Sequence, residues 1–123
     1  MTQAQTLALV ADIGGTNTRV ALAEGTQVRA DSIRRYSNAD YPGLEPVLRA
    51  YLADAGLASV AGACVAAAGP VRDGVAVMTN LDWTITGAGL TEATGAGRVA
   101  ILNDLQAQGH ALGHIASQFL RPV

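Results

Sequence analysis

The sequence contains no lysine, a single cysteine and few aromatic residues. All eight basic residues are arginines, which excludes a Walker A phosphate loop, because that motif needs a lysine before its serine or threonine. Cys64 has no partner for an intrachain disulfide, which is typical of a protein from a reducing compartment. With one Trp, three Tyr and one Phe, the core has to be built from small aliphatic side chains, which favours an α/β domain.

Charge and hydropathy argue against two classes of partner. The formal net charge is −2 and there is no long basic run, so we expect neither a nucleic-acid surface nor an anionic-membrane surface. No apolar run approaches the roughly 20 residues of a membrane span, and the first residues lack the basic segment of a signal peptide. We therefore expect a soluble, cytoplasmic protein of one domain over residues 1–123 that binds small molecules.

Hydrophobic periodicity predicts the order of the elements. Three strands come first, at Leu7–Ile13, Arg19–Ala23 and Val28–Arg35. Apolar residues at three- and four-residue spacing then predict a helix that starts near Pro42 and stops at Gly56. The remaining predicted elements are a strand at Val60–Ala68, a hairpin at Val71–Met78, an irregular segment at Thr79–Thr86, a helix at Ala88–Thr94, a strand at Arg98–Leu102 and a helix from Asp104 to Ile115.

A glycine-rich turn joins the first two predicted strands. Gly14 and Gly15 can take positive φ and let an oligophosphate approach the backbone N–H groups, while Thr16 and Asn17 add side-chain donors. Asp12, at the end of the first strand, is placed to face a phosphate-bound Mg²⁺ through water. A dinucleotide-binding fingerprint is excluded, since a strand and not a helix follows the glycines. An ordinary Gly-Gly hairpin turn remains the alternative.

An amide and a carboxylate follow the last predicted strand. Ligands of open α/β sheets bind at the carboxyl ends of strands, so Asn103 and Asp104 can point into a cleft. If the first and last strands are parallel neighbours, Asp12 and Asp104 emerge at one edge. That arrangement suits phosphoryl transfer, with Asp104 taking the proton of the acceptor hydroxyl and Asn103 bonding a neighbouring hydroxyl of the same molecule. Capping of the following helix is the alternative for this pair.

Two further segments lie between these motifs. Thr79 and Asn80 are candidates for lining the acceptor side of the cleft, although an ST or Asx turn explains them equally well. We assign Trp83 and Pro70 to the scaffold, because a lone tryptophan more often packs a cleft wall than touches substrate.

The Asp-Ile-Gly-Gly-Thr-Asn turn, the Gly-Pro dipeptide, the Thr-Asn-x-x-Trp segment and the Asn-Asp pair together resemble bacterial glucokinases, of the sugar kinase, Hsp70 and actin superfamily. The resemblance implies a ribonuclease H-like (actin-like ATPase) half-domain, with a mixed sheet in β-β-β-α-β-α-β-α order. It also implies ATP-dependent phosphorylation of a hexose, with ATP and Mg²⁺ as cofactors, glucose as the sugar and Asp104 as the catalytic base.

The resemblance covers the small N-terminal domain of such a kinase, and we expect the second domain to be absent from this chain. On that basis we expect the isolated chain to be inactive, and to form a homodimer or self-associate through uncovered apolar surface. A non-catalytic module of the same fold, which binds a sugar or a nucleotide for regulation, is the alternative function.

Overall fold

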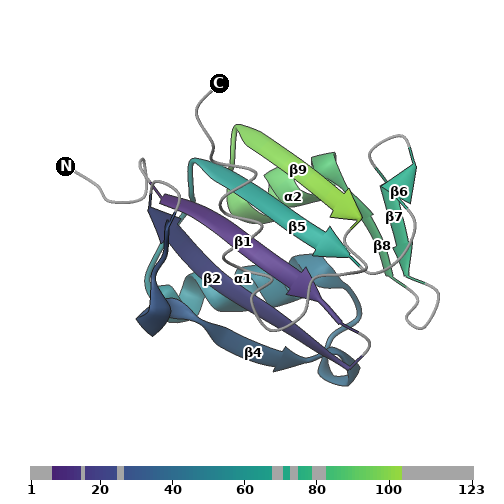
Figure 1. The fold of residues 1–123 in the computed structure, drawn as a ribbon, viewed down its shortest axis with the longest axis horizontal. Helices are drawn as coiled ribbons and strands as arrows, with labels where there is room; N and C mark the ends of the chain where they lie inside the picture. The colour runs from purple at the N-terminus through teal and green to yellow at the C-terminus, as the bar shows by residue number, and fades with distance from the viewer. Residues whose placement is uncertain are drawn as a thin grey trace.

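The computed structural model describes residues 7–14, 16–24, 27–67, 71–72, 75–78 and 83–103. Its largest element is a six-stranded mixed sheet in the order β3-β2-β1-β5-β9, with β4 also paired to β2 (Figure 1). The strands are β1 (Leu7–Ile13), β2 (Asn17–Glu24), β3 (Gln27–Val28), β4 (Arg34–Ser37), β5 (Gly62–Ala67) and β9 (Arg98–Asn103). The expected mixed α/β architecture is therefore confirmed.

Three neighbouring strands of the sheet, β1, β5 and β9, run parallel, and β9 lies at one end of the described strand order (Figure 1). All six residues of β5 are buried, as is usual for a parallel strand covered on both faces. The condition set for the first and last strands is met in part, because they are parallel but β5 lies between them. Their carboxyl ends still reach one edge, where Ile13 pairs with Ala67 and Ala67 with Asn103.

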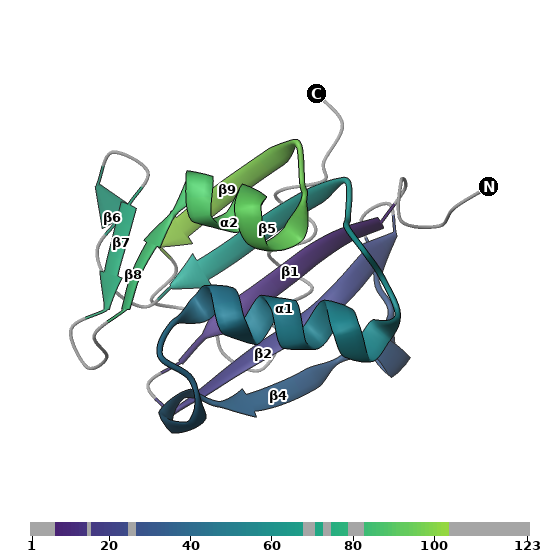
Figure 2. The same cartoon turned by 180° about the vertical axis from the view of Figure 1, so that it is seen from behind.

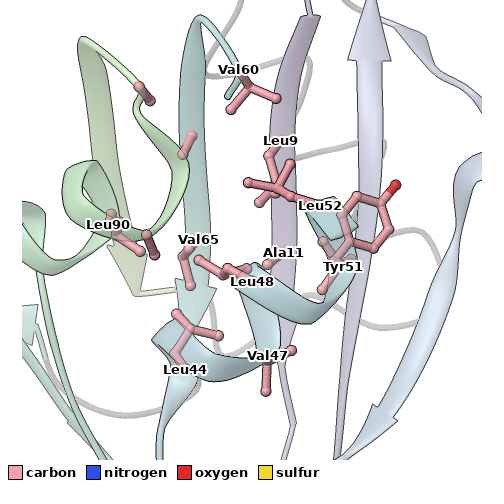
Figure 3. Packing of buried hydrophobic residues seen from close by; sticks show 14 of the residues in the cluster. Leu9, Ala11, Leu44, Val47, Leu48, Tyr51, Leu52, Val60, Val65 and Leu90 are labelled. Carbon is pink, nitrogen blue, oxygen red and sulfur yellow. The ribbon is translucent and has the colours of Figure 1, made fainter. Parts of the chain in front are cut away.

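Two helices, α1 (Leu44–Ala55) and α2 (Gly87–Thr94), cover one face of the sheet (Figure 2). The buried residues of α1 follow the predicted spacing and are Leu44, Val47, Leu48, Tyr51 and Leu52. They pack against side chains of the central strands, including Leu9 and Val65 (Figure 3). The helix ends where predicted, because Gly56 adopts the left-handed conformation with φ 74°, which a residue without Cβ takes at little cost.

The opposite face of the sheet carries small side chains. Its buried residues are Ala8, Val10, Ala21, Ala23, Cys64 and Ala66. Their alternation with the residues that face α1 explains why the central strands contain almost no polar side chain. No helix in the described ranges is long and apolar enough to cross a bilayer.

The third predicted strand, Val28–Arg35, is wrong as one continuous element. A 3₁₀ turn at Ala30–Ser32 divides it into β3 and β4. The Ser32 hydroxyl accepts a hydrogen bond from Leu22 N (2.9 Å) and donates one to Arg29 O (2.6 Å). The Ser32 side chain thus takes the place of the backbone group that Leu22 N of β2 would bond on a continuous third strand. Serine often interrupts a strand in this way, because its hydroxyl competes with backbone partners.

A second sheet of three antiparallel strands stands beside the main one (Figure 1). It contains β6 (Val71–Arg72), β7 (Val75–Met78) and β8 (Trp83–Thr86). The first two form the predicted hairpin, but β8 corrects the expectation that Thr79–Thr86 is irregular. Trp83 and Ile85 are buried while Thr84 is exposed, a period-two pattern that the sequence already contains. The predicted helix from Asp104 lies outside the described residues.

The buried thiol of Cys64 yields a prediction about alkaline stability. Burial raises its pKa to about 12, against a smaller lowering by Arg98, whereas an exposed thiol titrates near 8.5. The native state therefore holds a proton that the unfolded state releases. Stability is complete below about pH 8.5 and falls by up to about 1.4 kcal/mol per pH unit as the pH rises towards 12.

Denaturant unfolding at pH 8 and pH 10, compared between the wild type and Cys64→Ala, measures this loss. Tyr36, whose pKa burial also raises to about 12, titrates in both proteins, so the difference isolates the thiol. Parallel pH profiles for the two proteins would contradict the prediction.

Candidate functional site

The candidate site lies where the three parallel strands end. Ile13, Ala67 and Asn103 form one row across β1, β5 and β9. Strands in a sheet are about 4.8 Å apart, so the ends of β1 and β9 lie roughly 10 Å from each other. The glycine-rich turn follows β1, and Asp104 follows Asn103 in the sequence. The carboxyl edge thus holds the start of the glycine-rich turn and Asn103, and this edge is where ligands of open α/β sheets bind.

The turn after β1 is closed by a backbone hydrogen bond from Gly14 N to Asn17 O (2.9 Å). Gly14 does not adopt positive φ, which corrects the reason we gave for a glycine here. The requirement is close approach, since a Cβ on Gly14 would lie 3.2 Å from Asn17 O. Thr16 is exposed and Asn17 is the half-buried first residue of β2, so the polar residues of the turn stand at the surface.

One residue from outside the turn holds its shape. Asn38, in the 3₁₀ turn Asn38–Asp40, is only 3% exposed. Its side chain donates to Gly14 O (2.9 Å) and accepts from the buried Thr18 hydroxyl (2.7 Å). Its backbone N–H donates to Thr16 O (2.9 Å). These three bonds hold the turn at Gly14, Thr16 and Thr18, while Thr16 stays exposed.

Asp12 is engaged in an ion pair across the β1–β2 hairpin. Arg19 is its register partner on β2, and Arg19 Nη2 donates to Asp12 Oδ2 at 2.7 Å. The side chain of Asp12 retains 16% of its exposure, so the pair is partly shielded from water. The ion pair sets the direction of the carboxylate at the edge where the turn begins.

Of the other site residues predicted from the sequence, the structure describes only Asn103. Asn103 is the last residue of β9 and lies at the candidate edge. Gly15, Thr79, Asn80 and Asp104 lie outside the described residues.

Sequence reasoning missed Asn38. No local pattern distinguishes it from other turn asparagines, and its side-chain partners are 20 and 24 positions away. Its burial between polar groups is visible only in the folded chain.

The fold defines a class of protein before any sequence comparison. A ROK family glucokinase from Streptomyces griseus in complex with glucose and AMPPNP superposes with a TM-score of 0.58 at 24% identity, over 82% of this chain and 34% of that one. A glucokinase from an Antarctic psychrotroph superposes with a TM-score of 0.70 at 31% identity, over 83% of this chain and 33% of that one. The domain has the fold of the actin-like ATPases, as in sugar kinases.

Sequence comparison narrows the class to one family. The family profile described as Glucokinase matches residues 9–123. The glucokinases of Caulobacter vibrioides and Pseudomonas paraeruginosa are each 40% identical over 119 residues, which is 95% of this chain and 36% and 34% of theirs. The chain therefore belongs to the glucokinase family, and it spans about a third of the length of these curated relatives.

The contacts of Asn38 predict the effect of removing its side chain. Asn38→Ala removes the partners of the buried Thr18 hydroxyl and of the half-buried Gly14 O, and the buried hydroxyl left unpaired costs about 1–3 kcal/mol. We expect a loss of stability, because the turn is no longer held. Denaturant unfolding of the wild type and the variant measures this effect.

A double-mutant cycle with Thr18→Val tests whether these bonds are the cause. Valine removes the orphaned hydroxyl, so the double variant should lose less stability than the sum of the single variants. Simple additivity would show that the two side chains do not interact.

Proposed function

We propose that these residues form the small domain of an ATP-dependent hexose kinase that converts glucose to glucose 6-phosphate. The observation that carries the proposal is the meeting of the glycine-rich turn and the end of β9 at one edge of the parallel strands. Membership of the glucokinase family supports the reaction class, and the glucose and AMPPNP named for the Streptomyces griseus structure support the two substrates.

The glycine-rich turn is our candidate for binding the phosphates of ATP. Thr16 is exposed, and Asn38 bonds the carbonyl groups of Gly14 and Thr16, so the backbone at these two residues is held in place before the nucleotide arrives. Gly14 and Gly15 let the phosphates approach, and Thr16 and Asn17 contribute side-chain donors. Such positioning accounts for much of the catalysis in phosphoryl transfer.

Asp12 is our candidate for contact with the magnesium ion of the nucleotide. A carboxylate oxygen is the kind of ligand that Mg²⁺ takes, and the ion usually keeps several waters, which suits an acid already paired with Arg19. Asp12 Oδ1 has no hydrogen-bond partner among the described residues and is available to such a water. When bound, the ion would neutralise charge that develops on the phosphates.

Asp104 is our candidate for the general base. Its carboxylate accepts the proton of the sugar hydroxyl as that oxygen bonds to the γ-phosphorus and the bond to the ADP oxygen breaks. Asn103, Thr79 and Asn80 bond neighbouring hydroxyls and orient the sugar. We expect the remaining contacts of both substrates to require the parts of the family fold beyond these 123 residues, and we expect the isolated residues to be inactive and to self-associate.

Replacing the general base tests the assigned chemistry. In the complete protein that carries these residues, Asp104→Asn should lower kcat by about two to four orders of magnitude, the usual contribution of a general base. Binding of ATP and glucose should persist, because asparagine keeps the size and the hydrogen-bonding capacity. A coupled assay for ADP release measures kcat.

Asparagine also preserves a helix cap, so the same variant separates the two interpretations of Asp104. If capping is its only role, Asp104→Asn keeps kcat within threefold of wild type, whereas Asp104→Ala costs about 1 kcal/mol of stability. Binding of both ligands without turnover in the wild-type protein would instead favour a regulatory module.

Obstructing the turn tests the phosphate assignment. Gly15→Val should raise KM for ATP and lower kcat, because the turn orients the reacting phosphates as well as binding them. Glucose affinity measured without nucleotide should change little. Gly97→Val is the matched control, since a Cβ on Gly97 meets nothing within 4 Å. An equal loss of glucose and ATP affinity in Gly15→Val would indicate misfolding and not a phosphate site.

A further inference from the structure

A hollow of about 340 Å³ lies at the end of the sheet opposite the glycine-rich turn. Its apolar lining includes Leu7, the first residue of β1, with Leu22 of β2 and Leu57 beyond α1. The turn begins after Ile13, six residues further along β1, which is roughly 20 Å at the usual strand rise. The hollow is therefore separate from the candidate active site.

The wall of the hollow on the helix side is held rigidly. Tyr51 of α1 is 1% exposed, and its hydroxyl donates to Ser32 O at 2.8 Å. Figure 3 shows this hydroxyl pointing away from the aliphatic side chains of the core. Ser32 is itself bonded to β2 and to Arg29, so the helix, the 3₁₀ turn and the sheet are joined at this place.

Two arginines with no assigned role line the same hollow. Arg29 and Arg34 are exposed, and neither guanidinium has an ion-pair or hydrogen-bond partner among the described residues. Burial raises the pKa of Tyr51, and the Ser32 side chain and then the charges of Arg34 and Arg29 offset only part of this rise. Both arginines line the same hollow as this phenol, Arg34 from β4 and Arg29 from the position just before the 3₁₀ turn.

Two acids complete the polar lining. Asp54 accepts a hydrogen bond from the Tyr36 hydroxyl (3.4 Å), and Asp31 precedes Ser32. The four charged side chains sum to zero, so the hollow is not a general anion trap. Carboxylates only accept hydrogen bonds, and they suit a ligand that carries hydroxyl groups as well as an anion.

We propose that this hollow binds a small phosphate ester that carries hydroxyl groups, the chemistry of a sugar phosphate. A doubly charged phosphate matches two unpaired guanidiniums, which bind its oxygens in a forked geometry. Hydroxyls of the same ligand donate to Asp31 and Asp54. The volume is at the small end of the roughly 300–1,000 Å³ of ligand sites, which suits a molecule of monosaccharide size.

Amide NMR on the complete protein that carries these residues tests the proposal, with glucose 6-phosphate, inorganic phosphate and glucose as probes. Glucose 6-phosphate should shift the amides of Ser32 and Leu57 in a saturable manner. Inorganic phosphate should bind there at least tenfold more weakly, and glucose should leave these amides unchanged. The amides of Gly14 and Thr16 report separately on the active site, so failure of one site is distinguishable from failure of the other.

Arg34→Gln should weaken binding at Ser32 and Leu57 by about tenfold or more, as expected for the loss of a charged hydrogen bond. Arg35→Gln is the matched control, because the next residue of β4 points to the opposite face of the sheet and carries the same charge. Equal weakening by both variants, shifts confined to Gly14 and Thr16, or equally tight binding of inorganic phosphate would each overturn the proposal.

Discussion

The parallel pairing of β5 with both β1 and β9 is the constraint on which the rest of the structure depends. Each pairing places the end of one strand beside the end of the next, so residues 54 positions apart at Ile13 and Ala67 share one row. Parallel strands need long connections, and α1 and α2 each lie within such a connection on one face. The sheet edge and the helical layer are thus two results of the same pairing.

The small size of the central side chains follows from this constraint. β5 is covered on both faces, and its sequence of glycine, alanine, cysteine and valine lets the layers approach closely. The cost is that β5 contributes no polar group to the site. The polar residues of the candidate site therefore lie in the turn after β1 and at the end of β9. The turn is held by Asn38, the residue that follows the edge strand β4.

Elements with an uninterrupted hydrophobic period could be predicted from the sequence, as β1, β5, α1 and α2 illustrate. The third strand failed because the Ser32 hydroxyl competes with the backbone for Leu22 N, which periodicity does not register. The position of the turn could be predicted from the sequence. The reason why Gly14 must be a glycine could not be predicted, because its close contact with Asn17 exists only in the folded hairpin. Asn38 was out of reach because its hydrogen bonds are entirely non-local.

Strand β4 connects the two ends of the sheet. Its first residue, Arg34, lines the hollow beside Tyr51, and its last, Ser37, pairs with Asn17 of the turn. Asn38 follows directly. A chain of contacts between two sites couples binding at one to binding at the other only if an element along it can adopt two conformations. β4 is four residues long and its described pairing is with β2 alone, so it is held less firmly than the central strands. An anion that engages Arg34 would therefore act on β4, the strand that leads directly into Asn38 and so to the hydrogen bonds that hold the glycine-rich turn.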